Sequence, residues 1–126
     1  MTINTVLLID DDDDIRAIAA VSLASRGPWI VLQARSGHEG VALAASSAPD
    51  LILLDVTMPT MDGPTTLLRL REQPATRDTP VIFMTARGKG HDDEVVAHLL
   101  SLGAAGVITT PYHPMNLADD IRKIMG

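Results

Sequence analysis

Short, continuous apolar runs are the feature that most constrains how this chain can fold. They recur five times and have the length of strands: Val6–Ile9, Trp29–Leu32, Leu51–Leu54, Val81–Met84 and Gly106–Ile108. Several are rich in Val and Ile and do not alternate with polar residues, which is typical of strands buried on both faces. Because such strands need helices on each side of their sheet, the runs predict an α/β fold.

Segments with helical spacing separate the runs. The first has an apolar face and is expected to begin at an N-cap formed by Asp13 or Asp14. That face consists of Ile15, Ile18, Ala19 and Leu23. Ser36 and Glu39 stand at the spacing of a capping box, which predicts the start of a second helix. Three further helices are expected at Thr65–Arg71, Val95–Leu102 and Met115–Met125.

The alternation of strands and helices predicts an open parallel sheet with right-handed crossovers. In such a sheet the functional crevice lies beyond the carboxyl ends of the strands, at the topological switch point. The polar residues that follow the runs are therefore the candidate site: Asp10, Asp11, Asp55, Thr85 and Thr109–Thr110. The remaining acids of the first cluster, Asp12–Asp14, are interpreted as the charge of a helix first turn, with a secondary role in attracting cations.

The size and charge of the chain argue against several classes of protein. Its 126 residues are expected to form one domain, residues 1–126, with a sizeable core. A net charge of -6 argues against direct contact with nucleic acid, which needs a basic surface. The sequence has no apolar run near the roughly 20 residues of a membrane span and no basic, signal-like start. We therefore expect a soluble, cytoplasmic protein.

Four segments, in order, carry a resemblance that covers essentially the whole chain. The segments are IDDDDDIRAI, PDLILLDVTMPTMDGPTTLLRLRE, TPVIFMTA and GAAGVITTP. In this order they resemble the successive signatures of the two-component response-regulator receiver domain, a CheY-like superfamily. The most specific part is the segment 49–63. The resemblance implies a flavodoxin-like fold, in which a doubly wound five-stranded parallel sheet of order 2-1-3-4-5 carries helices on both faces.

The resemblance also implies a role for each candidate residue. Asp55 matches the phosphoacceptor, and Asp10 and Asp11 match the acidic pair that holds Mg²⁺, for which Mn²⁺ can substitute. Asp11 is implied as a direct ligand, Asp10 as a ligand mainly through water, and Thr57 as a ligand through its backbone carbonyl. Thr85 matches the switch hydroxyl that turns toward the phosphoryl group. Phosphoryl transfer to a carboxylate brings two anions together, and a hard cation with oxygen ligands offsets both charges.

Two positions depart from the family pattern. Thr110 stands where the family has a lysine, directly before Pro111, which matches a proline that usually follows a cis bond. A lysine pairs with phosphoryl oxygens as a point charge, whereas a threonine offers only a neutral hydrogen bond. Val107 stands where many members carry an aromatic side chain that moves with the switch hydroxyl. Arg87 and Lys89, in a longer loop, are candidate replacement cations, although ordinary solvated charges are the favoured interpretation.

The expected function is therefore that of a phosphoacceptor module in a two-component phosphorelay. It would modify itself at Asp55 and would not turn over a substrate as an enzyme does. Its expected partners are a histidine kinase or phosphotransfer protein and a downstream protein, and it is expected to be a monomer or a weak dimer. The downstream protein should bind at the surface formed by Val95–Leu102, Val107–Thr109 and Met115–Ile124.

Two alternatives remain open from the sequence. A degenerate receiver would bind partners without phosphorylation, which Thr110 and Val107 favour and the intact acid cluster disfavours. A haloacid-dehalogenase-like phosphohydrolase, less favoured, would use Asp10 as its nucleophile. Turnover of a generic phosphomonoester would distinguish this enzyme from both kinds of receiver. The sequence also leaves open whether the domain stands alone or belongs to a longer chain.

Overall fold

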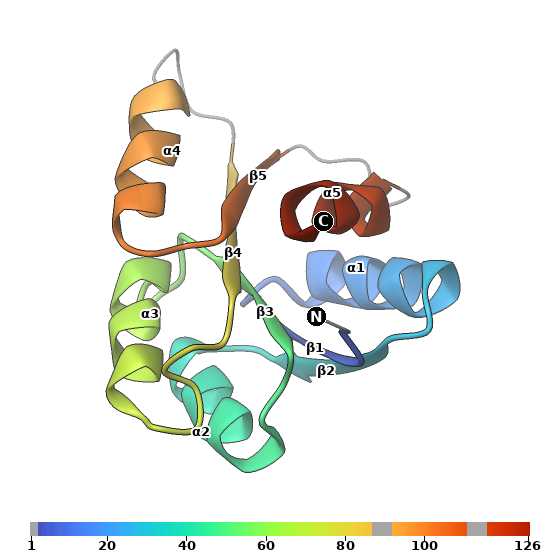
Figure 1. The fold of residues 1–126 in the computed structure, drawn as a ribbon, viewed down its shortest axis with the longest axis horizontal. Coiled ribbons are helices and arrows are strands. Elements are labelled where there is room, and N and C mark those ends of the chain that lie inside the picture. The colour runs from blue at the N-terminus through green and yellow to red at the C-terminus, as the bar shows by residue number, and fades with distance from the viewer. Residues whose placement is uncertain (1–2, 87–91, 111–115) are drawn as a thin grey trace.

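Five parallel strands form one sheet, and a helix follows each strand (Figure 1). The structure is a computed structural model that describes residues 3–86, 92–110 and 116–126. The strands are β1 (Thr5–Ile9), β2 (Ile30–Ala34), β3 (Leu51–Asp55), β4 (Val81–Ala86) and β5 (Gly106–Thr110). The helices are α1 (Asp13–Arg26), α2 (Gly37–Ser47), α3 (Gly63–Glu72), α4 (Asp92–Ser101) and α5 (Leu117–Met125). The strand order β2-β1-β3-β4-β5 confirms the predicted topology.

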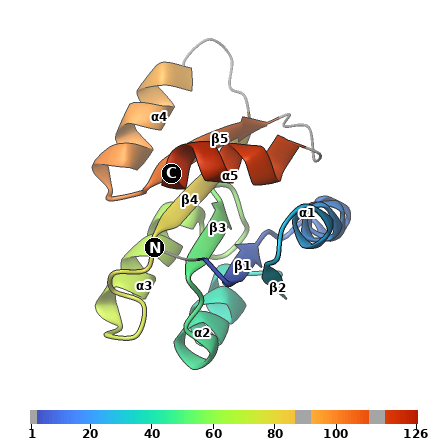
Figure 2. The same ribbon diagram turned by 45° about the vertical axis from the view of Figure 1, so that its right-hand side comes forward.

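The sheet separates two hydrophobic cores. Successive side chains of a strand point to opposite faces, so that Val6 and Leu8 of β1 enter one core while Leu7 and Ile9 enter the other. Figures 1 and 2 show α1 and α5 over the first face and α2, α3 and α4 over the second. Each fully buried side chain of this size stabilises the fold by about 1.5–3 kcal/mol. This packing fixes the strands and therefore the positions of the residues at their ends.

The predicted apolar runs lie almost wholly within the observed strands, but four strands extend farther at their carboxyl ends. β2 continues to Ala34, β3 includes Asp55, β4 continues through Thr85 to Ala86, and β5 continues to Thr110. Trp29, which begins the second predicted run, lies just before β2. It packs against the first core, and the guanidinium of Arg122 lies 5.1 Å from its ring centroid.

The N-cap of the first helix lies one residue before the nearer of the two predicted N-caps. The carboxylate of Asp12, and not that of Asp13 or Asp14, accepts the free backbone N–H groups of the first turn. It accepts from the backbone N–H groups of Asp14 and Ile15, both at 3.0 Å. Asp13 and Asp14 instead place their charges in the first turn of α1, which is the role predicted for them.

The buried face of α1 also differs from the prediction. Ala19 and Leu23 are buried as expected, but Ile15 and Ile18 are 45% and 54% exposed. The stripe that faces the protein has the spacing i, i+3, i+4 and i+7. It consists of Arg16, Ala19, Ala20 and Leu23. The helix is therefore rotated by about one residue, because Arg16 has polar partners near the sheet that Ile15 would lack.

The other helix starts agree in part with the sequence. The hydroxyl of Ser36 accepts from the backbone N–H of Glu39 at 3.1 Å, which confirms the predicted cap of α2. The carboxylate of Glu39, however, accepts from the backbone N–H of Arg35 rather than from that of Ser36. Met115, the predicted start of the last helix, lies outside the described residues, and α5 begins at Leu117.

Candidate functional site

Three acidic side chains meet at the carboxyl edge of the sheet. Asp10 directly follows β1, and Asp55 ends β3, the neighbouring strand. Together with Asp11, they offer carboxylate oxygens that all lie within 4.8 Å of one another. β2 lies on one side of β1 and β3 on the other, so the strand order reverses between β1 and β3. This edge is therefore the topological switch point at which a site is expected. The structure thus brings together the three carboxylates predicted from the sequence.

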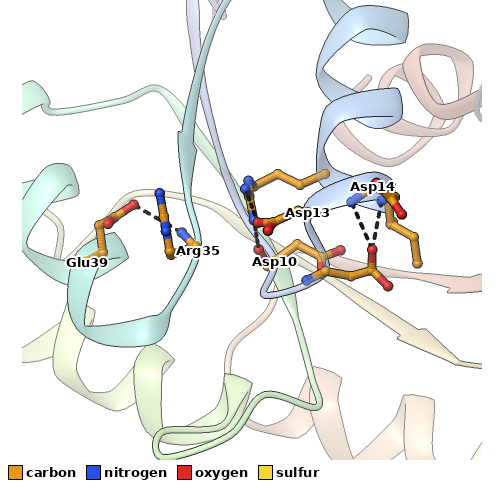
Figure 3. A network of polar contacts seen from close by, with 8 residues as sticks. Asp10, Asp13, Asp14, Arg35 and Glu39 are labelled. Carbon is orange, nitrogen blue, oxygen red and sulfur yellow. Dashed lines mark hydrogen bonds and ion pairs between the residues drawn. The ribbon is translucent and has the colours of Figure 1, made fainter.

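Asp10 is the most constrained of the three acids. Only 5% of its surface is exposed, and its backbone N–H donates to the carbonyl of Ala34 at 3.1 Å. Its Oδ1 accepts from the backbone N–H of Asp12 at 2.9 Å. Burial raises the pKa of Asp10, and the charge of Asp11 adds to the rise, whereas the Asp12 hydrogen bond opposes it. Figure 3 shows this acid beside the first turn of α1.

The carboxyl of Asp55 has a pKa far from its ordinary value. Burial first, and then the charge of Asp10, raises this pKa from 3.8 to about 7. A hydrogen bond from the backbone of Thr57 opposes the rise, and contact with Asp11 contributes to it. Burial and the negative charge of neighbouring acids cause this rise in pKa. A cation bound among these acids would therefore restore the ionised form of Asp55.

The loop after Asp55 is closed tightly onto the strand. The backbone N–H of Gly63 donates to the carbonyl of Val56 at 2.8 Å. A Cβ at Gly63 would lie 2.5 Å from the Asp55 carbonyl oxygen and 2.8 Å from the Val56 Cα, so only glycine fits. Within this loop, Met61 donates its N–H to the Pro59 carbonyl at 2.7 Å, and the residue between them, Thr60, has a φ of 70°. The loop after Asp55 therefore contains a γ-turn centred on Thr60, whose left-handed φ is unusual for a β-branched residue.

The predicted switch residues lie on β4 and β5, the two strands at one end of the sheet. Thr85 is a buried residue of β4, with 9% of its surface exposed. In the parallel register Thr85 pairs with Thr109, and Ala86 pairs with Thr110, the last residue of β5. Val107 is half-buried and packs against the second core. Arg87, Lys89 and Pro111 lie outside the described residues.

The donor set fits a hard divalent cation. All three side chains offer carboxylate oxygens, which Mg²⁺ prefers over nitrogen or sulfur ligands. The half-buried Asp55 and the exposed Asp11 leave part of the cluster open to water, and Mg²⁺ usually keeps several waters. Thr57, whose backbone carbonyl was predicted as a further ligand, lies in the loop directly after β3 and contacts the Asp55 carboxylate through its backbone.

Arg16 is a residue of this region that the sequence analysis missed. Its Nη1 donates to the backbone carbonyl of Asp10 at 2.7 Å, and its Nη2 lies 2.5 Å from the carboxylate of Asp13. The side chain is only 12% exposed. The spacing of Arg16 to Ala19, Ala20 and Leu23 was the signal that could have identified it as part of the buried face of α1.

Residues 6–122 match the model of the response regulator receiver domain family. The chain is 38% identical over 122 residues to the transcriptional regulatory protein CpxR of Escherichia coli K12, covering 97% of this chain and 49% of CpxR. It is 35% identical over 120 residues to the DNA-binding dual master transcriptional regulator RpaA of Synechocystis, covering 95% of this chain and 48% of RpaA. The chain thus spans about half the length of these relatives.

Solved structures show the same fold. The chemotaxis protein CheY4 of Vibrio cholerae superposes with a TM-score of 0.84 at 27% identity, covering 98% of this chain and 99% of CheY4. The receiver domain of the Francisella response regulator 1452 gives a TM-score of 0.82 at 27% identity, with 96% of this chain and 95% of that domain covered.

Among the helices in the described ranges, none has the length and apolar composition needed to cross a membrane.

Proposed function

Because the chain belongs to the response regulator receiver domain family, we propose that it accepts a phosphoryl group on Asp55 and signals through a protein-binding surface. Receiver domains bind Mg²⁺ and work with histidine kinases and downstream effectors. The observation that carries the proposal is the convergence of Asp10, Asp11 and Asp55 within 4.8 Å at the switch point of the sheet. Residues 1–126 act as one receiver domain, and the chain works in the cytoplasm with a histidine kinase or phosphotransfer protein as donor.

The transfer step joins Asp55 to the phosphorus of a donor phosphohistidine. A carboxylate oxygen of Asp55 forms the new P–O bond while the P–N bond breaks, and the electron pair returns to the imidazole nitrogen of the donor. Mg²⁺, held by Asp10, Asp11, Asp55 and the carbonyl of Thr57, would offset the charge of the carboxylate and of the phosphoryl oxygens. The burial that raises the pKa of Asp55 also limits access of water to the acyl phosphate formed there.

The response follows from the position of Thr85 on β4. Its hydroxyl would turn toward the phosphoryl group, and β5, which pairs with β4, would move with it. A downstream protein would then bind across α4, β5 and α5. This surface contains a hollow of about 280 Å³ lined by Val107, Ile108, Asp120, Lys123 and Ile124. A change at the ends of β4 and β5 would therefore lie close to a surface that can accept a partner side chain.

A second candidate is a receiver that binds its partner without phosphorylation. The specific observation in its favour is Thr110 at the end of β5, in place of the family lysine, together with Val107. The family match over residues 6–122 disfavours the phosphohydrolase alternative, in which Asp10 would be the nucleophile.

Acetyl phosphate with and without Mg²⁺ tests the proposal. We expect metal-dependent labelling of Asp55 alone, located by borohydride reduction and peptide mass spectrometry, and no labelling of Asp55→Asn. Asp78→Asn, a change of an exposed acid far from the site in the sequence, is the matched control and should label like the wild type. Label on Asp10 or in Asp55→Asn would contradict the mechanism. Absence of label would favour the second candidate, and hydrolysis of p-nitrophenyl phosphate would favour the phosphohydrolase.

A further inference from the structure

Arg16 connects the first turn of α1 to the backbone of the acidic pair. Its guanidinium donates from Nη1 to the Asp10 carbonyl at 2.7 Å and from Nη2 to the Asp13 carboxylate at 2.5 Å. The exposures of the two side chains differ, at 12% for Arg16 and 75% for Asp13. The bond to the carbonyl is thus shielded from water, whereas the ion pair with Asp13 is largely solvated and weak.

The carbonyl that Arg16 binds belongs to the peptide group between Asp10 and Asp11. A peptide group is planar, so a hydrogen bond to its oxygen fixes the orientation of the whole plane. This plane sets the direction in which the chain leaves Asp10 and hence the direction in which the Asp11 side chain points. Asp11 itself is exposed and lies in the short segment between β1 and α1, where packing alone would leave its orientation weakly defined.

The backbone N–H and the Oδ1 of Asp10 also form hydrogen bonds. Its N–H donates to Ala34, and its Oδ1 accepts from the N–H of Asp12. The Arg16 bond to the carbonyl completes this set, and one carboxylate oxygen of Asp10 lies within 4.8 Å of carboxylate oxygens of Asp11 and Asp55. Three hydrogen bonds, to the end of β2, to the N-cap of α1 and to Arg16 within α1, therefore define how the acidic pair is oriented.

We propose that Arg16 is a positioning residue of the divalent-cation site. It holds the peptide between Asp10 and Asp11 so that both carboxylates point toward Asp55. The inference rests on the proposed function, since it assigns a purpose to the geometry of the same site. Groups that orient the ligands of a metal typically change its affinity by about 10–100-fold when they are removed.

A purely electrostatic role for Arg16 would have the opposite sign. A guanidinium near three carboxylates repels a divalent cation, so its removal would tighten cation binding if charge alone mattered. Arg35 provides the matched control for charge. It follows β2 at the same edge of the sheet, is exposed, and interacts electrostatically with Asp13. Its backbone N–H donates to the carboxylate of Glu39 (Figure 3).

Calorimetric titration of the full chain with Mg²⁺ alone separates these roles. We expect Arg16→Gln to bind Mg²⁺ about 10-fold more weakly than the wild type. Arg16→Lys, which keeps the charge but lacks the fork that reaches both partners, should show an intermediate loss. Arg35→Gln should bind Mg²⁺ as well as the wild type or slightly more tightly. Thermal unfolding of each variant in metal-free buffer reports global destabilisation separately.

Several results would overturn the assignment of Arg16. These are tighter binding by Arg16→Gln, an equal loss in Arg35→Gln, or a lowered melting temperature with unchanged Mg²⁺ affinity. If Arg16→Gln does not fold, Arg16→Lys decides, and its binding as tightly as the wild type would also refute the proposal. A wild-type chain that fails to bind Mg²⁺ would instead contradict the proposed function, so the two failures are distinguishable.

Discussion

Asp55 combines a buried carboxyl with two acidic neighbours, and this combination makes its charge depend on pH. In the unfolded chain an Asp has a pKa of about 3.9, whereas in the folded chain the pKa of Asp55 is raised to about 7. Below the unfolded pKa the carboxyl is protonated in both states, and its contribution to stability is fully present. As the pH rises through the folded pKa, the folded chain must ionise a carboxyl in an unfavourable environment, and this contribution is lost.

We therefore predict that Asp55→Asn becomes more stable relative to the wild type as the pH rises from about 4 to 8, because Asn does not ionise. The gain at pH 8 without metal should be roughly 2 kcal/mol after a discount for solvent screening. Urea unfolding at several pH values measures it. Saturating Mg²⁺ should reduce the gain, since a bound cation stabilises the ionised carboxylate of the wild type. A difference in free energy of unfolding that is constant with pH would contradict the raised pKa.

At the scale of single elements, the strands were easier to predict than the helices. A continuous apolar run marks a strand by composition alone, so each run located its strand within about two residues. The expectation of burial on both faces was wrong for β2, an edge strand whose Ile30 is 62% exposed. The carboxyl ends were missed because hydropathy stops at the first polar residue, whereas the hydrogen-bond ladder continues through Asp55, Thr85 and Thr110. The three acids of the site were predicted for the same reason, because a polar residue directly after a buried run is easily located in an α/β sheet.

Helix α1 was harder to predict because its informative residue is polar. Apolar periodicity placed Ile15 on the buried face, but the buried position belongs to Arg16, whose stem is covered while its guanidinium bonds the Asp10 carbonyl. The N-cap was ambiguous for a related reason. With five consecutive aspartates, side-chain preference cannot tell which one has the extended backbone of a cap, and only the path of the chain assigns it to Asp12.

This assignment gives a prediction for α1. Asp12→Ala should lower the free energy of unfolding by about 1 kcal/mol, because it removes the acceptor for two backbone N–H groups. Asp14→Ala removes a charge of the same sign from the first turn without removing the cap, so its effect should be less than half as large, or about 0.5 kcal/mol at most. Urea unfolding in metal-free buffer compares the two variants. A larger loss of stability in Asp14→Ala than in Asp12→Ala would indicate that Asp14, one of the caps expected from the sequence, is the N-cap of α1.

At the scale of the whole molecule, the two cores and the single sheet connect the acid cluster with the α4, β5 and α5 surface. The cluster lies at the ends of β1 and β3, and the proposed binding surface begins two strands away at β5. A population shift along this path requires contacts that differ between the unphosphorylated and phosphorylated states. In the family pattern the lysine before the proline supplies such a contact, and this chain has Thr110 there.

We predict that Thr110→Lys strengthens the coupling between the phosphoryl group and the binding surface. Thr110 ends β5 in register with Ala86, and it stands where the family pattern has the lysine that pairs with phosphoryl oxygens. A charge-assisted hydrogen bond is worth about 1.5–3 kcal/mol, and 1.4 kcal/mol is about a tenfold change in an equilibrium constant. With beryllofluoride as the phosphoryl mimic, the ratio of active to inactive molecules should therefore rise by about tenfold or more.

Amide NMR shifts of β5 and α5 measure this ratio in the beryllofluoride complex. Thr110→Gln is the control for side-chain length, and it should behave like the wild type because it adds no charge. Arg87→Ala combined with Lys89→Ala removes the two cations that the sequence offers as replacements. No gain in Thr110→Lys, together with a large loss in this double variant, would mean that the cation has been relocated to that loop. A gain in Thr110→Lys with no loss in the double variant would mean that the wild-type chain signals with a weaker switch, because phosphoryl oxygens that a lysine would neutralise are left to water and neutral donors.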